Sequence, residues 1–141
     1  MALIKKADPA DIPAIARILD EAGLVYPGQP ADGFFVAVDN GSIVGIARLE
    51  EQARFNFLSS LGVSQANRRR HIASSLVKYL IGINNKPTYL YTIIPDFFSR
   101  LGFVPSPGRP DLPPKEIFGC QECEPDRCHC MVKLNRDTPL S

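Results

Sequence analysis

The sequence has almost no net charge and no long apolar run. Its 16 lysines and arginines are balanced by 15 aspartates and glutamates, which leaves a formal net charge of +1. A balanced chain has no global field that favours nucleic acid or an anionic membrane, so we expect neither as a partner. No stretch is long enough for a signal peptide or a bilayer span. These absences predict a cytoplasmic protein with reduced thiols, in which anion recognition depends on a local cluster of charges.

Several motifs are missing as well. The sequence has no internal repeat and no low-complexity tract. No glycine pattern has the spacing of a Walker P-loop or of a dinucleotide-binding fingerprint, and no Ser-His-Asp order with a nucleophile elbow is present. With 141 residues, the chain has about the length of one domain. We therefore expect a single domain over residues 1–141 whose chemistry differs from that of P-loop, Rossmann and serine-hydrolase proteins.

Hydrophobic periodicity and turn residues predict alternating strands and helices. Asp8 can cap a helix that Gly23 closes, and the Asp-Asn-Gly turn at 39–41 indicates a hairpin. The expected order is β-α-β-β-β-α-β-α-β, with strands near residues 3–7, 34–38, 42–52, 54–63, 88–94 and 128–134 and helices near 8–23, 70–84 and 95–102.

The two longer helices each have an expected apolar face. Residues spaced three and four apart lie on one side of a helix, and that side packs on the core. These positions are Ile12, Ile15, Ala16 and Leu19 in the first helix, and Ile72, Leu76, Val77, Leu80 and Ile83 in the second.

Four consecutive basic or imidazole residues, Arg68 to His71, lie between a strand that ends at Val63 and the second helix. The first turn of a helix has backbone N–H groups without intrahelical partners, and the helix dipole is positive at that end. Such a turn binds phosphate, and arginines add charge-assisted hydrogen bonds. Small residues at positions 73–75 let a bulky ligand approach the backbone. We therefore predict a site for a pyrophosphate or a polyphosphorylated cofactor; the alternative is a solvated helix start.

The stretch GVSQANRRRHIASSLVKYL, residues 62–80, resembles the acetyl-CoA loop of the GNAT superfamily of N-acetyltransferases. In that family, a strand ending in Val precedes Gln/Arg-x-x-Gly-x-Gly/Ala, which opens a helix. Here Arg68 takes the first position, His71 the first glycine and Ala73 the last. The element order and PDFFSRLGF, which is similar to the family's short helix ending in Leu-Gly-Phe, extend the resemblance over nearly the whole chain. It implies an α+β fold, an α/β/α sandwich with a mixed, mainly antiparallel sheet of the acyl-CoA N-acyltransferase type.

The same resemblance implies acetyl-CoA as the cofactor. The residues around the basic cluster would hold the pyrophosphate of CoA, and the splayed end of the preceding strand would pair with the pantetheine arm. The expected CoA-binding residues are Leu61, Gly62, Val63, Arg68, Arg69, Arg70, His71, Ile72, Ala73 and Ser74.

The C-terminal part resembles small N-acetylglutamate synthase-like members of the superfamily. The matching residues are Thr92, Pro95, Phe97 and Phe98, then Leu112, Pro113 and Lys115, then Cys120 and Cys123. Phe57 and Ser59 replace a Glu and an Arg of that subgroup, and the loss of an arginine that could clamp a carboxylate argues against glutamate as acceptor. Phe98 stands where many GNAT enzymes have a Tyr general acid, although the subgroup also has Phe there.

By this resemblance, a neutral amine attacks the thioester directly, and the enzyme removes a proton and stabilises the oxyanion. Backbone N–H groups from Leu61 to Val63 are the expected oxyanion donors. Glu50 or Glu51 is the candidate base, since one of two adjacent strand residues can face the cleft, although both can also face solvent. Ser60, which the subgroup pattern retains, and Thr92 at a strand end are further candidates for the catalytic site.

All four cysteines lie in a C-terminal segment over residues 111–135. Their density in a reduced compartment suggests a metal more than disulfides. Four thiolates, or three with His129, could hold zinc, but packed free thiols and a redox pair are alternatives. The candidate metal ligands are Cys120, Cys123, Cys128 and Cys130.

The sequence therefore predicts an N-acetyltransferase that moves an acetyl group from acetyl-CoA to an amine of a small molecule or amino acid. The alternatives are a CoA-binding or metal-sensing regulatory module without catalytic activity, and an enzyme that acetylates proteins. A homodimer is possible, since related folds often pair.

Overall fold

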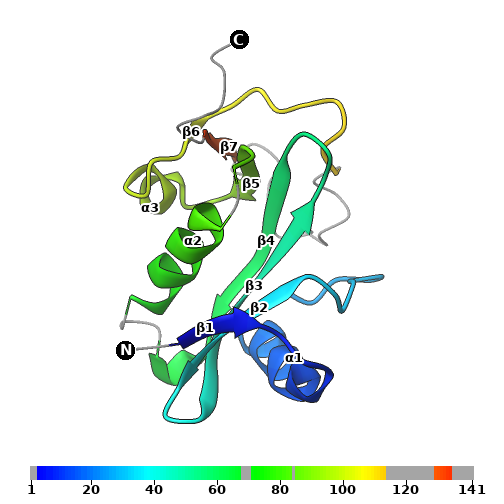
Figure 1. The fold of residues 1–141 in the computed structure, drawn as a ribbon, viewed down its shortest axis with the longest axis vertical. Coiled ribbons are helices and arrows are strands. Elements are labelled where there is room, and N and C mark those ends of the chain that lie inside the picture. The colour runs from blue at the N-terminus through cyan, green and yellow to red at the C-terminus, as the bar shows by residue number, and fades with distance from the viewer. Residues whose placement is uncertain (1–2, 68–70, 84, 114–128, 135–141) are drawn as a thin grey trace.

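Figure 1 shows a computed structural model of the chain, which describes residues 3–67, 71–83, 85–113 and 129–134. The elements in these residues are β1 (Leu3–Lys6), α1 (Ile12–Glu21), β2 (Phe34–Asp39), β3 (Ser42–Glu51), β4 (Asn56–Val63), α2 (Ile72–Gly82), β5 (Thr88–Thr92), α3 (Pro95–Ser99), β6 (Val104–Pro105) and β7 (His129–Lys133), with short 3-10 turns at Pro9–Asp11 and Gln65–Asn67. No helix in this part of the chain is long and apolar enough to cross a membrane.

The strands form one sheet in the order β1-β2-β3-β4-β5-β7-β6. Neighbouring strands are antiparallel except for β4 and β5, which are parallel. This confirms the expected mixed, mainly antiparallel sheet. The predicted order lacked β6, whose two residues pair with β7 at Val104↔Val132 and Pro105↔Met131. A two-residue strand has no side-chain period, so the sequence pattern did not reveal it.

Helices cover both faces of the sheet, as Figure 1 shows with α1 on one side and α2 and α3 on the other. On the α1 face, Phe34, Val36 and Ile46 pack with the buried residues of the helix. On the α2 face, a larger cluster includes Leu58 and Leu90. Two apolar layers on one sheet make the α/β/α sandwich.

The buried face of α1 differs in part from the prediction. Ile15 and Leu19 are buried, but Ile12 is 46% exposed and Ala16 is also exposed, whereas Ile18 is 0% exposed. The α-helix begins only at Ile12, because a 3-10 turn occupies Pro9–Asp11. Positions three and four apart counted from Ile15 therefore form the core stripe.

The termini of the predicted elements are largely as expected. Gly23 has a φ of 69°, the left-handed conformation that ends α1, and Asn40 and Gly41 have φ values of 51° and 78°. Two consecutive left-handed residues fit the two-residue hairpin turn between β2 and β3. In α2 the four predicted core residues up to Leu80 are buried. Ile83 lies beyond the end of that helix and is 46% exposed, so its predicted core position is wrong.

Candidate active site

A bulge interrupts the ladder between β3 and β4. The register pairs Ile46 with Gly62, but then Arg48 with Ser59, so Ser60 and Leu61 together lie opposite a single residue, Ala47. Ser60 has a φ of 53°, which is uncommon for a residue other than glycine. Bulges bend a strand and redirect its backbone groups. The site is therefore built around an irregular position in β4.

The bulge aims two successive N–H groups at the same edge of β4. The N–H of Asn56 donates to Pro87 O at 2.8 Å, away from β3, and the N–H of Ser64 donates to Val44 O at 2.8 Å, towards β3. Backbone N–H groups alternate between the two edges of a strand. Every second residue after Asn56 shares its direction, so the N–H of Ser60 points away from β3, towards β5. The N–H of Leu61 is three residues before that of Ser64 and therefore has the opposite direction, which is also away from β3.

On that side, β4 has separated from β5. The parallel pairs are Asn56↔Thr88 and Phe57↔Tyr89, whereas β4 continues to Val63. The edge of β4 that carries the two aligned N–H groups therefore lies beyond the paired region. The pairing thus has the predicted splay. The same alternation directs the N–H of Gly62 towards β3, so of the expected range Leu61 to Val63 this residue is not available, whereas Ser60 is an additional candidate donor.

The side chains around the bulge divide between the two faces. Leu61 and Val63 pack with the α2 cluster. A Cβ on Gly62 would lie 3.1 Å from Leu24 Cδ1 and 3.4 Å from Ile18 Cγ2, so this glycine allows α1 to pack closely on β4. The predicted contacts of these residues with pantetheine therefore depend on their backbone.

The predicted phosphate turn is described only in part. Arg68, Arg69 and Arg70 lie outside the described residues. His71 directly precedes α2 and has φ 59° and ψ 23°, the left-handed conformation that a glycine adopts most easily. The hydroxyls of Ser74 and Ser75 donate to His71 O at 2.9 and 3.0 Å. The side chain of Ile72 is buried in the core, so this residue can offer a ligand only its backbone N–H.

The face of the sheet that carries α1 has a buried cation, Arg48, which the sequence analysis did not identify. It is 8% exposed, and its Nε donates to Asp32 O at 2.8 Å. Nη2 lies 3.3 Å from Asp32 Oδ1, and Nη1 lies 3.6 Å from Glu50 Oε2. The only sequence signal was one charged residue in the apolar run from Ile43 to Leu49.

The two candidate bases have different surroundings. Glu50 is half-buried beside Arg48, and its Oε1 accepts a hydrogen bond from Gln52 Nε2 at 2.9 Å. Glu51 is exposed, and the period of two directs its side chain to the opposite face of β3. Burial raises the pKa of the Tyr26 hydroxyl above its ordinary value; the charge of Arg48 opposes this shift and that of Glu50 adds to it. Tyr26 therefore lies close to this charged group.

The other two catalytic candidates lie on strands, Ser60 in the bulge of β4 and Thr92 at the end of β5. Ser60 Oγ accepts a hydrogen bond at 3.4 Å from Nε2 of Gln29, which also donates to Leu24 O at 3.2 Å. Thr92 Oγ1 accepts the N–H of Ile94 at 2.9 Å, where β5 turns into α3. Ser60 thus connects the segment after α1 to the bulge, and Thr92 supports a turn at the end of β5.

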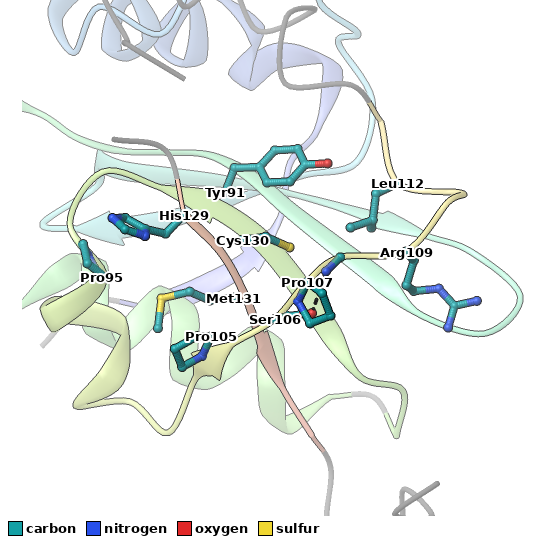
Figure 2. Close-up of a pocket in the computed structure, with 11 residues that line it drawn as sticks. Tyr91, Pro95, Pro105, Ser106, Pro107, Arg109, Leu112, His129, Cys130 and Met131 are labelled. Atoms are coloured by element: carbon teal, nitrogen blue, oxygen red, sulfur yellow. Dashed lines mark hydrogen bonds between the residues drawn. The ribbon is translucent and has the colours of Figure 1, made fainter. Parts of the chain in front are cut away.

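A pocket of about 380 Å³ lies beside the open end of β5. Figure 2 shows its lining from β5, β7 and the segment after β6, including Tyr91, Leu112 and His129. The Tyr91 ring packs 5.1 Å from the ring of Phe57, the last paired residue of β4, and its hydroxyl donates to Pro113 O at 2.5 Å. Tyr91 therefore lies between the pocket and the buried ring of Phe57 on β4.

Three of the four predicted metal ligands lie outside the described residues, namely Cys120, Cys123 and Cys128. Cys130 is a half-buried residue of β7 and lines the pocket beside Tyr91. Among the residues that are described, no group of three or more histidine, cysteine or acidic side chains is arranged to hold a metal. The expectation of zinc has no support in this part of the chain.

Comparison with known proteins identifies the family. The model of the acetyltransferase (GNAT) domain matches residues 30–105, more than half of the chain. A search of curated proteins finds no match. Several solved acetyltransferase structures are similar in fold, and three of them are described here.

A Mycobacterium tuberculosis protein in complex with CoA has a TM-score of 0.74 and 19% identity, with 94% of this chain and 98% of that chain covered. The N-acetylglutamate synthase of Neisseria gonorrhoeae, complexed with coenzyme A and L-arginine, has a TM-score of 0.74 and 19% identity; 96% of this chain but only 33% of that chain is covered. A ribosomal-protein-alanine N-acetyltransferase of Escherichia coli has a TM-score of 0.74 and 17% identity over 100% of this chain and 98% of that chain. The resemblance seen in the sequence is confirmed: the chain belongs to the GNAT family and is an acetyl-CoA-dependent N-acetyltransferase.

Proposed function

We propose that this enzyme acetylates the amine of a small molecule or amino acid, with the thioester of acetyl-CoA held at the bulge of β4. The proposal rests on the N–H groups of Ser60 and Leu61. Because of the bulge, both point to the same edge of β4, at a place where β4 no longer pairs with β5. A thioester carbonyl at that edge accepts hydrogen bonds from both groups. Preorganised donors of this kind stabilise the oxyanion that forms during acyl transfer.

The donor enters from the side of α2. The first turn of this helix offers backbone N–H groups and the positive end of its dipole to the pyrophosphate of CoA. His71, which stands at the position of the family's first glycine, has a left-handed backbone, and Ala73 and Ser74 are small. The pantetheine arm then runs along the open edge of β4 towards the bulge.

The acceptor approaches from the opposite face, where Arg48 and Glu50 lie. We assign Glu50 as the base, because its half-buried carboxylate is on this face and Glu51 is on the other. The carboxylate takes a proton from the ammonium, directly or through water, and the neutral nitrogen attacks the thioester carbon. The C–S bond then breaks, and the CoA thiolate takes up a proton to leave as free thiol.

The test is release of CoA thiol from acetyl-CoA by the purified full-length protein, with amino acids, polyamines and short peptides as acceptors. We expect turnover with at least one free amine. Glu50→Gln should lower kcat by about 10²-fold to 10⁴-fold, the usual contribution of a general base. The matched variant Glu51→Gln should stay close to wild type. Calorimetric binding of CoA without turnover of any acceptor would favour the regulatory module, and activity on peptides alone would favour protein acetylation.

A further inference from the structure

Arg48 is a buried cation that lies next to the bulge that forms the proposed oxyanion site. Its register partners are Phe34 on β2 and Ser59 on β4, directly next to the bulged Ser60. A register shift of one residue would move its side chain to the other face of the sheet. The pairing with Phe34 therefore sets the face that carries the guanidinium, and the bulge of β4 brings the proposed backbone donors next to it.

The guanidinium holds two carboxylates that come from different segments. Glu50 is two residues further along β3, and Asp32 belongs to the segment that leads into β2. The side chain of Asp32 is 86% exposed and that of Glu50 is 38% exposed, whereas the side chain of Arg48 is only 10% exposed. Without the cation, the two carboxylates would repel each other, and Glu50 would turn towards solvent.

We infer that Arg48 is the positioning residue for Glu50 in acetyl transfer; this inference rests on the proposed function. Both oxygens of the Glu50 carboxylate have partners, since Oε2 faces Arg48 Nη1 at 3.6 Å and Oε1 accepts from Gln52 Nε2 at 2.9 Å. A base held on both sides keeps one orientation relative to the acceptor nitrogen. Misplacement of a reacting group by about 1 Å costs on the order of 100-fold in rate, so the orientation of this carboxylate matters for catalysis.

The contacts of Arg48 argue against the alternative that it binds a carboxylate of the acceptor. All three of its nitrogens already face protein oxygens: Nε and Nη2 face Asp32, and Nη1 faces Glu50. Its low exposure leaves little access for a further anion. The exposed polar atoms of the group are carboxylate oxygens, which accept protons and bind ammonium groups.

The experiment is a double-mutant cycle that compares Arg48→Met, Glu50→Gln and the double variant in the thiol-release assay, with the best amine from the panel. Arg48→Met alone should lower kcat by about 10-fold to 100-fold, while the KM for acetyl-CoA stays within about twofold. In the Glu50→Gln background, the same change should cost less than about threefold, because Arg48 then has no base to orient. Arg17→Met, an exposed arginine of α1, is the matched control.

Arg48→Lys keeps a cation at the site. It replaces Arg48→Met in the double-mutant cycle if the Met variant does not fold. It should lose part of the rate in the wild-type background and almost none in the Glu50→Gln background. Equal losses in both backgrounds would overturn the positioning role and leave the proposed function intact. A rise in the acceptor KM alone, confined to acceptors that carry a carboxylate, would also overturn it. Absence of wild-type turnover would instead reject the proposed function itself.

Discussion

Replacement of His71 by glycine should stabilise the protein. His71 has φ 59° and ψ 23° immediately before α2. For a residue with a Cβ, the left-handed helical conformation is about 1–2 kcal/mol less favourable than the right-handed one, and glycine does not have this cost. Glycine loses more backbone freedom on folding, which offsets about 0.5–1 kcal/mol. The net gain is therefore about 1 kcal/mol, which for a domain of this size corresponds to roughly 2–4 °C in Tm.

The matched control is His71→Ala, which removes the imidazole but keeps a Cβ in the same conformation. The hydrogen bonds that Ser74 and Ser75 donate to position 71 end on its backbone oxygen, so neither variant removes them. Urea unfolding of the three proteins measures the free energy of unfolding. We expect a gain for glycine only. An equal gain for alanine, or no gain for glycine, would refute the assignment of backbone strain to His71.

The same variants test the phosphate site. Without a side chain at position 71, the backbone N–H groups at the start of α2 are more accessible to phosphate oxygens. Calorimetry with CoA should therefore give a lower Kd for His71→Gly than for the wild type, with His71→Ala between them. Weaker binding in both variants would show that the imidazole itself contacts the cofactor.

Two further predictions concern packing and pH. Gly45→Ala should lower the free energy of unfolding by about 1–3 kcal/mol, because the new Cβ would lie 2.7 Å from Ile72 Cγ2; Gly82→Ala, with no atom within 4 Å, should be neutral or slightly stabilising in the same urea titration. The hydrogen bond from Arg109 lowers the pKa of Asp111 below its ordinary 3.8, so its stabilising effect is present above that pH and is lost as pH falls through the lowered value. The Tm difference between wild type and Asp111→Asn should therefore disappear in acid, and a constant difference from pH 7 to 3 would contradict this.

Elements with strong local patterns were predictable from the sequence. The apolar stripe of α2 and the Asn-Gly turn at 40–41 need only short-range spacing, and both are present, although the stripe ends at Leu80 and does not include Ile83. The face of α1 was predicted less well, because the 3-10 turn before Ile12 decides where the helix begins. β6 was missed, since two residues that pair with β7 carry no pattern of their own.

The charged part of the site could not be predicted because it depends on pairing between strands. Arg48 contacts Asp32, which is 16 positions earlier in the sequence, because β2 and β3 pair in a register that sets Phe34 opposite Arg48. The sequence left Glu50 and Glu51 as equal candidates. The structure separates them by placing Glu50 on the face of Arg48.

By itself, the sequence determined the order of the main elements and the membership of the GNAT family, and it predicted a phosphate-binding turn, because each of these depends on residues that are close together in the chain. Only the tertiary structure decided that Ser60 and Leu61 direct successive N–H groups to the open edge of β4 and that Arg48 holds Glu50. The first feature arises from one extra residue in β4 and the second from the register between β2 and β3; both are set by how the whole sheet pairs and packs against its helices.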